Sequence, residues 1–157
     1  MRFLNFIKVH SIILFLFLFS NISLNSCLAG KKKKMLTTKF NEVNVRNGPG
    51  INHLKIFKIL KKGYPLNITD NFGNWMKIVD VDGNSGWISN TQLSNKKYII
   101  VNSNQAYIYK FPLKNSKKIA LVKGKKVLAF NKCNDDWCFI NDEEIKGWVM
   151  KKGVWGY

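Results

Sequence analysis

Short stretches in which apolar and polar side chains alternate recur along most of the chain, separated by turn-forming residues. A period of two is that of a half-buried β-strand. Asn-Gly-Pro-Gly at 47–50 and Asp-Gly-Asn at 82–84 have the composition of turns. The pattern therefore predicts five short strands and no helix between residues 36 and 95, which is typical of one small β-barrel. The predicted strands are 37–46, 56–60, 64–68, 75–81 and 86–89.

The same order of strands and turns returns between residues 97 and 157. Pro49 and Pro112 lie 63 residues apart, and the tryptophans show offsets of 62 and 61, Trp75 to Trp137 and Trp87 to Trp148. A near-constant offset indicates a duplicated unit. The sequence predicts an all-β protein with two tandem barrels, 36–95 and 97–157. The linker of about three residues predicts that the barrels touch or are held close.

Residues 1–29 have the three parts of a secretory signal peptide, which we expect to be helical. Arg2 and Lys8 form the basic end, and eight large apolar residues follow at 12–19. Cys27-Leu28-Ala29 fits cleavage after Ala29. Alternatively, Cys27 fits a lipoprotein signal and would carry the lipid. We expect export to the periplasm, with lipid anchoring to the membrane as the alternative. Residues 30–35 form a basic spacer.

The net charge of +17 comes almost entirely from lysine, since Arg2 and Arg46 are the only arginines. Arginine is the better residue for bidentate phosphate recognition, so we expect no nucleic-acid partner. The run at Lys31, Lys32, Lys33 and Lys34 could contact an anionic bilayer, as could a lipidated Cys27. A basic protein that binds polyanions or a membrane surface is therefore the alternative function.

Three motifs of the first unit resemble the bacterial SH3-like (SH3b) domain: Val45-Arg46-Asn47-Gly48-Pro49, Asn74-Trp75 and Gly86-Trp87-Ile88. The second unit departs from the first motif, with Lys110-Phe111-Pro112-Leu113 in its place. Its cysteines around Trp137, Gly147-Trp148-Val149 and Trp155-Gly156 are similar to the second unit of exported tandem SH3-like proteins. The resemblance implies a five-stranded, strongly bent barrel with a non-enzymatic role. Some members of the family target cell-wall hydrolases to peptidoglycan.

The paired tryptophans are expected to have structural roles. A tryptophan buries a large area, so Trp75, Trp87, Trp137 and Trp148 are expected to pack in the core and hairpins of small barrels; a stacking face for a peptide or glycan is the alternative. Gly86 and Gly147 are expected to relieve crowding at a bend, and Trp155 is also assigned a structural role. Arg46 could clamp turn carbonyls or pair with an acidic residue such as Glu42, with contact to a ligand carboxylate as the alternative.

Cys133 and Cys138 flank a predicted hairpin turn, and in an exported protein the pair is most simply a disulfide. The matching places in the first unit hold Asn71 and Met76. Two cysteines and one distant histidine fall short of a metal site. His53 is expected to be an exposed loop residue, so no catalytic residue, cofactor or metal is predicted, and the protein is expected not to be an enzyme.

The sequence therefore favours an exported, non-catalytic binding or scaffold protein of the cell envelope. Its tandem domains would recognise a peptide, peptidoglycan or an envelope protein in a shallow groove between loops, as extended peptides dock on aromatic-lined surfaces. The candidate ligand-binding residues are Asn47, Pro49, Tyr64, Tyr107, Tyr109 and Tyr157.

Overall fold

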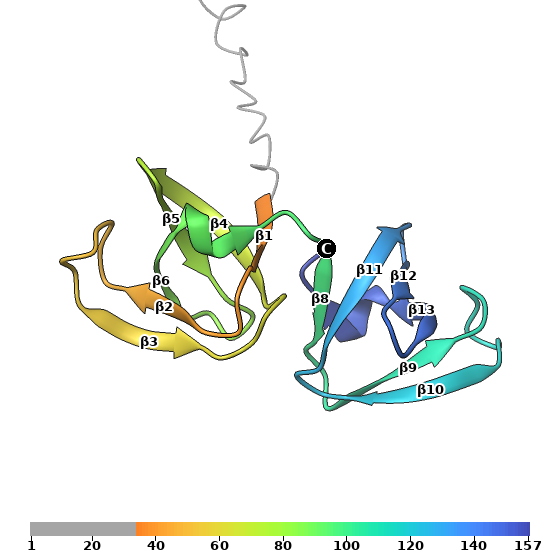
Figure 1. Cartoon of the computed structure of the whole chain (residues 1–157). Coiled ribbons are helices and arrows are strands. Elements are labelled where there is room, and N and C mark those ends of the chain that lie inside the picture. Colours follow the sequence, from red (N-terminus) through yellow and green to blue (C-terminus); the bar gives the residue numbers. More distant parts are fainter. Residues whose placement is uncertain (1–33) are drawn as a thin grey trace, which may run out of the picture. The chain divides into compact units, whose positions relative to one another are not determined.

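A computed structural model describes residues 34–157 (Figure 1). The signal peptide, Cys27 and the lysines at 31–33 lie outside the described residues. The described chain is all-β, with two seven-stranded sheets and two short 3-10 helices, η1 (Asn90–Gln92) and η2 (Lys151–Gly153). In Figure 1 the sheet of each half is folded over on itself rather than flat.

The first sheet, which we call barrel one, contains strands β1 to β7 in the order β3-β2-β6-β5-β4-β1-β7. All of the neighbours pair antiparallel. The strands are β1 (Lys34–Thr38), β2 (Val43–Arg46), β3 (Lys55–Ile59), β4 (Pro65–Phe72), β5 (Trp75–Val79), β6 (Ser85–Ser89) and β7 (Leu93–Ser94).

The second sheet, barrel two, has the order β10-β9-β13-β12-β11-β8-β14. Each strand of barrel one corresponds to the strand numbered seven higher in barrel two, so the two orders are the same. The duplication predicted from the sequence offsets is therefore confirmed at the level of topology. The strands are β8 (Tyr98–Val101), β9 (Gln105–Tyr109), β10 (Lys118–Lys123), β11 (Val127–Cys133), β12 (Trp137–Asn141), β13 (Lys146–Met150) and β14 (Val154–Trp155).

The expected single strand at 37–46 is wrong, and so is the count of five strands for each barrel. The polar residues between Thr38 and Val43 form a bend, so this stretch divides into β1 and β2. The two strands then join different neighbours: β1 pairs with β4 and β7, whereas β2 pairs with β3 and β6. The bend is what lets one sheet fold over on itself.

The first strand of each barrel pairs with the last strand of the same barrel. In barrel one Thr37 lies opposite Ser94, and in barrel two Val101 lies opposite Val154. The two ends of each barrel are therefore neighbours in the sheet. Hydrogen bonds from the Thr37 hydroxyl to the carbonyls of Ser94 and Lys96, at 3.3 and 3.0 Å, add to this closure in barrel one.

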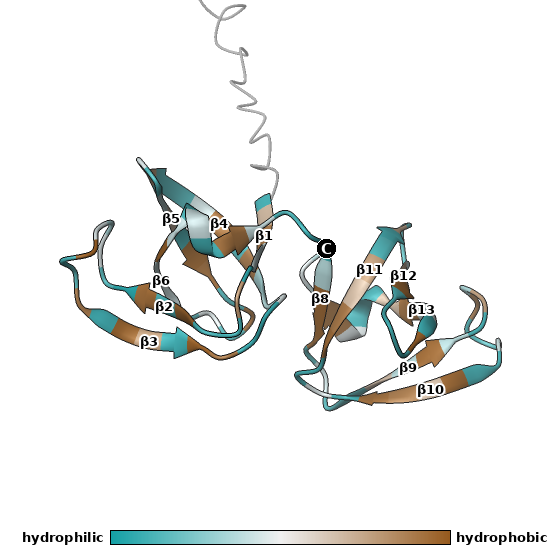
Figure 2. Ribbon diagram, in the orientation of Figure 1, coloured by the Kyte–Doolittle hydropathy of each residue, from teal (hydrophilic) through white to brown (hydrophobic). Residues whose placement is uncertain are grey.

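Each barrel has its own core, and both cores are mainly aliphatic. In Figure 2 hydrophobic positions, drawn in brown, occur along the strands of both halves. Leu66, Ile78 and Ile88 are fully buried in barrel one, and Leu128, Ile140 and Val149 are their counterparts in barrel two. Alternation of buried and exposed positions along β2, β6 and β13 produces these cores. Branched side chains of this kind fill a small bent sheet closely.

The tryptophans do not belong to the two core clusters, although Trp137 is buried and Trp75 pairs with Phe72 at the hairpin between β4 and β5. Trp75, Trp87 and Trp148 are only partly buried and belong to neither core cluster. Trp137 is buried, but it packs edge-on against Tyr109, with 5.2 Å between the ring centroids, and is also outside the core cluster. The indoles therefore cover the outside of the sheets, where one edge of a large ring can remain in water.

Gly86 and Gly147 occur at a close approach between strands in the two barrels. A Cβ atom on Gly147 would lie 2.8 Å from the carbonyl oxygen of Tyr109 and 2.8 Å from Ile119 Cδ1. A Cβ atom on Gly86 would meet the equivalent groups, the Arg46 carbonyl oxygen at 2.9 Å and Ile56 Cδ1 at 3.1 Å. The same geometric need therefore explains the glycine before each second tryptophan.

Candidate functional site

The loop at 47–54 is closed by hydrogen bonds, and the side chain of Arg46 donates one of them. The guanidinium group donates a hydrogen bond of 2.6 Å to the carbonyl oxygen of His53 and lies 6.0 Å from the Trp75 ring centroid. The Asn47 amide also bonds the Leu54 carbonyl across the loop, at 3.1 Å. Of the roles considered for Arg46 from the sequence, the structure therefore shows the first: its side chain binds a carbonyl oxygen of the turn.

Glu42 is not the partner of Arg46. Its carboxylate lies 2.6 Å from the ammonium group of Lys58, one strand away. The hydrogen bond and charge of Lys58 hold the pKa of Glu42 below its usual range. The expectation of an Arg46–Glu42 pair was based on nearness in sequence, and the pairing of β2 with β3 brings Lys58 to the acid instead.

The six predicted ligand-binding residues are not all on the surface. Asn47 is exposed, and Pro49 and Tyr64 are half-buried. Tyr107 and Tyr157 are 37 % and 49 % exposed, whereas Tyr109 is only 4 % exposed. Tyr109 is therefore wrong as an exposed contact, because the Trp137 ring packs edge-on against it and covers it.

The predicted ligand-binding residues lie in different parts of the molecule and do not form one site. Asn47 and Pro49 belong to the loop after β2, where a Cβ atom on Gly50 would lie 3.1 Å from Cδ2 of the His53 ring. Tyr64 instead precedes β4, near Asp80 and Asp82 in the turn between β5 and β6. Burial and these two negative charges raise the pKa of Tyr64 to about 12. Asp80 is buried and accepts hydrogen bonds from Asp82 N and from Asn84 N, at 2.9 and 2.8 Å, so it has a structural role in the turn.

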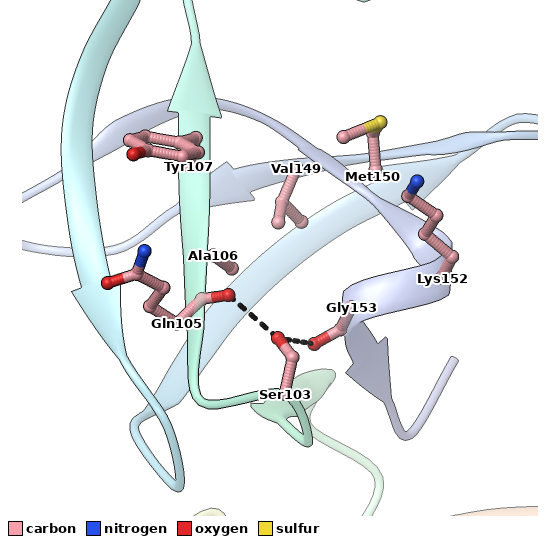
Figure 3. Close-up of a pocket in the computed structure, with 8 residues that line it drawn as sticks. All are labelled: Ser103, Gln105, Ala106, Tyr107, Val149, Met150, Lys152 and Gly153. Atoms are coloured by element: carbon pink, nitrogen blue, oxygen red, sulfur yellow. Dashed lines mark hydrogen bonds between the residues drawn. The ribbon is translucent and has the colours of Figure 1, made fainter.

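One predicted residue, Tyr107, lies at a cavity in barrel two (Figure 3). The cavity has a volume of about 240 Å³ and opens between β9 and the end of β13. At its base the Ser103 hydroxyl faces the carbonyls of Gln105 and Gly153, at 2.8 and 3.3 Å. Its lining residues are Ser103, Gln105, Ala106, Tyr107, Val149, Met150, Lys152 and Gly153.

An exposed apolar face adjoins this cavity. Leu121 lies directly opposite Tyr107 in the pairing of β10 with β9, and it is 54 % exposed. Side chains directly opposite each other on neighbouring strands lie on the same face of a sheet. The ammonium group of Lys118 lies 4.0 Å from the centroid of the Tyr107 ring, which is a cation–π contact. We call Tyr107, Leu121 and the cavity the tyrosine groove.

The equivalent face of barrel one is polar. Asn44 takes the place of Tyr107, and its cross-strand partner is Lys58, which pairs with Glu42. The sequence reasoning missed this difference, as well as the cavity itself. The exposed tyrosine alternating with buried Ala106 and Ile108 was the available signal for the groove.

Cys133 and Cys138 form a disulfide, as predicted, and lie opposite each other at the ends of β11 and β12. Asn71 and Met76 face each other at the same register in barrel one. Among residues 34–157 no cluster of histidine, cysteine, aspartate or glutamate side chains could hold a metal ion. No helix in this part of the chain is long and apolar enough to cross a membrane.

The family model of the bacterial SH3 domain matches the chain twice, at residues 39–95 and 102–156. The protein belongs to the bacterial SH3 domain family. The two matches coincide with barrels one and two, so the resemblance stated from the sequence motifs is confirmed. No curated protein shows a significant match to the sequence.

Solved structures with similarity to these tandem bacterial SH3 domains include two proteins from Trichomonas vaginalis and one from Bacillus cereus. NlpC2 and NlpC1 of Trichomonas vaginalis are 16% and 14% identical, with TM-scores of 0.35 and 0.36; the matches cover 78% and 80% of this chain and 48% and 46% of those chains. An NlpC/P60 family protein of Bacillus cereus is 14% identical with a TM-score of 0.35, over 79% of this chain and 56% of that one. The chain thus spans about half the length of each.

Proposed function

We propose that this protein is an exported, non-catalytic binding protein of the cell envelope, and that the tyrosine groove of barrel two is where it holds an extended peptide. The peptide would be a stem peptide of peptidoglycan or a segment of an envelope protein. Membership in the bacterial SH3 family and the signal-like leader support the location.

The observation that carries the proposal is the combination of an aromatic side chain, a neighbouring apolar side chain and a cavity on one face. Tyr107 and Leu121 offer apolar contact, while the Ser103 hydroxyl at the base of the cavity and Lys152 supply polar groups. Recognition surfaces for extended peptides are shallow and aromatic-lined, with a few polar groups that fix orientation. A groove of about 240 Å³ suits one or two residues of such a peptide rather than a large cofactor.

The test is a binding titration of the exported protein with purified wall stem peptides and with envelope protein extracts fractionated by affinity. Tyr107→Asn installs the residue that barrel one has at this position and removes the ring. We expect it to weaken binding by about tenfold, in the range of a partly exposed aromatic contact.

The matched control is Asn44→Ala at the equivalent position of barrel one, which is expected to leave binding unchanged. Equal affinity of Tyr107→Asn and the parent protein would contradict the assignment of the groove. Absence of retention on both classes of ligand would contradict the function itself.

The proposal includes no catalysis. His53 is the only histidine after the leader, and its ring lies against Gly50 in a loop held by Arg46. Incubation with purified peptidoglycan is therefore expected to release no fragments. Release that disappears in His53→Ala would instead identify an enzyme.

The location is tested by the mass of the mature N-terminus. Cleavage after Ala29 gives a free periplasmic protein, and a lipid mass on Cys27 gives an anchored one. Retention of residues 1–29 in a protein that stays in the cytosol would overturn the location.

A further inference from the structure

A second cavity, formed by the end of barrel one together with the linker and Tyr98 of β8, is lined by three lysines and no acidic residue. It has a volume of about 320 Å³ and lies where β1 ends and the chain passes from β7 towards β8. We call it the lysine groove. Its lining residues are Thr37, Thr38, Lys39, Phe40, Lys62, Ser94, Lys96 and Tyr98.

The backbone that carries the three lysines is held in place by hydrogen bonds to the end of β1. The Thr37 hydroxyl donates to the carbonyl of Lys96 at 3.0 Å. The Thr38 backbone bonds the two residues after Lys62, because its amide donates to Tyr64 O at 3.0 Å and its carbonyl accepts from Gly63 N at 2.9 Å. The Thr38 hydroxyl donates to the carbonyl of Lys61, the residue before Lys62. The Lys39 amide donates to Gln92 O at 2.8 Å. The lysines therefore extend from a fixed frame rather than from free loops.

The charges in this groove are not neutralised by the described part of the chain. The ion pairs formed by residues 34–157 involve Lys58, Lys125 and Lys126, and none involves a lysine of the groove. Cations gathered around one cavity repel each other, and an anion bound between them removes that repulsion.

Two aromatic rings complete the groove. Phe40 is 50 % exposed, and the ammonium group of Lys39 lies 5.6 Å from its ring centroid. Tyr98 is half-buried, and its ring packs over Gly63, where a Cβ atom would come within 3.0 Å of it. The groove thus joins positive charge to apolar surface, which suits an anionic group attached to an apolar portion.

Barrel two shows that the fold does not require these lysines. The sheet pairings place Ile100 and Val101 where barrel one has Thr37 and Thr38. By the same alignment of the repeats, Lys39, Lys62 and Lys96 correspond to Asn102, Gly124 and Tyr157. The charged groove is therefore particular to barrel one, although lysine is abundant throughout the chain.

We propose that the lysine groove is a binding site for a phosphate group, as carried by a phosphate ester or a lipid headgroup. A lysine ammonium binds phosphate as a point charge with three donors, and several such groups around one cavity suit a multiply charged oxyanion. Phe40 and Tyr98 would contact the apolar part of the ester. This site is independent of the tyrosine groove, which lies in the other barrel.

The experiment titrates the exported protein with pyrophosphate, followed by amide shifts in NMR spectra, and measures its sedimentation with vesicles of phosphatidylglycerol or of phosphatidylcholine. The groove variant is Lys39→Gln/Lys62→Gln/Lys96→Gln. The control variant, Lys114→Gln/Lys117→Gln/Lys132→Gln, removes the same charge from exposed positions of barrel two. All six lysines are exposed, so both variants are expected to fold, and thermal unfolding checks this.

We expect the affinity of the groove variant for pyrophosphate to fall about tenfold or more. The affinity of the control variant should fall less than about threefold, because that variant lowers only the overall positive charge of the protein. Binding to phosphatidylglycerol vesicles that the groove variant alone loses identifies a lipid source. Pyrophosphate binding without vesicle binding identifies a free phosphate ester.

Equal losses in the two variants would overturn the site, because binding would then follow net charge alone. Binding of neither probe by the parent protein would overturn it as well. Tyr107→Asn is expected to leave phosphate binding unchanged, so failure of this site and failure of the proposed peptide groove are distinguishable.

Discussion

Barrels one and two have the same strand order and the same crowded glycine, yet they present different chemistry at equivalent positions. The face of β2 and β3 in barrel one is polar at the pair formed by Asn44 and Lys58. The equivalent face of β9 and β10 in barrel two is apolar at the pair formed by Tyr107 and Leu121. The cavity at the end of the first strand carries three lysines in barrel one, where barrel two has Asn102, Gly124 and Tyr157.

The comparison separates what the fold requires from what binding requires. Positions that close the sheet are alike in both repeats, such as Gly86 and Gly147, whose missing Cβ atoms face equivalent neighbours. Positions on the surface differ, because no packing constraint acts on them. Ligand class is therefore to be sought in the differences between the repeats and not in the fold that they share.

The largest expected effect concerns the crowded glycine that both barrels have at the same position. Gly86→Ala and Gly147→Ala each place a Cβ atom within 3 Å of a backbone carbonyl oxygen, and we expect each to cost about 2–3 kcal/mol in the free energy of unfolding of its own barrel. Amide hydrogen exchange measures the two barrels separately. Gly153→Ala is the control, since its Cβ atom would lie 3.3 Å from the Ser103 hydroxyl oxygen and 3.9 Å from Ala106 Cβ, with no backbone atom as close. Unequal losses for the two glycines would break the equivalence of the barrels.

The next effect concerns a difference between the barrels, the disulfide. Cys133→Ser/Cys138→Ser is expected to lower the free energy of unfolding of barrel two by about 2 kcal/mol, because it frees a short loop in the unfolded chain. Denaturant titration with and without a reductant measures this loss.

The reciprocal variant in barrel one, Asn71→Cys/Met76→Cys, is expected to form a disulfide, since these residues face each other at the same register. Its stabilisation should be smaller than the loss in barrel two, because Met76 belongs to the core. Failure to oxidise would show that the two hairpins differ in geometry.

The smallest effect is a dependence on pH confined to barrel one. Burial, together with the charges of Asp80 and Asp82, raises the pKa of Tyr64 from its ordinary value of 10.0 to about 12. Between these two values the unfolded chain has released the proton and the folded barrel retains it. The stability that this group contributes is therefore present below pH 10 and is lost as the pH rises towards 12.

Alkaline unfolding of the parent protein and of Tyr64→Phe measures this contribution. The variant is expected to lose less stability over the same range of pH. Barrel two has Lys126 at this position and offers the internal comparison. Identical alkaline unfolding of both proteins would contradict the assignment to Tyr64.

Most of the architecture could be predicted from the sequence, because the signals for it are local. Period-two alternation and turn residues located most of the strands, and the spacing of tryptophans revealed the repeat. The match of Asn71 and Met76 to the two cysteines was also correct to the residue. The bend that divides β1 from β2 was missed because residues 39–42 lack glycine and proline.

The chemistry of the surface was harder to predict, because it depends on pairing between distant segments. Lys39 and Lys96 are far apart in sequence and meet only because β1 pairs with β7. Tyr109 follows the same alternation as Tyr107, but its contact with Trp137 buries it, and the sequence does not show that contact. The absence of the tryptophans from the core clusters was not predictable, because hydrophobicity indicates burial in general and does not distinguish a core from a covering layer.

The pairing of the first strand with the last within each barrel has a consequence for how such a protein can arise. Because entry and exit lie side by side, a gene segment that encodes one repeat can be copied in frame without stretching or threading the chain. A circularly permuted repeat, opened at a surface loop and joined at these adjacent ends, should fold for the same reason. Copies added in this way would begin identical and then acquire separate ligands on their outer faces.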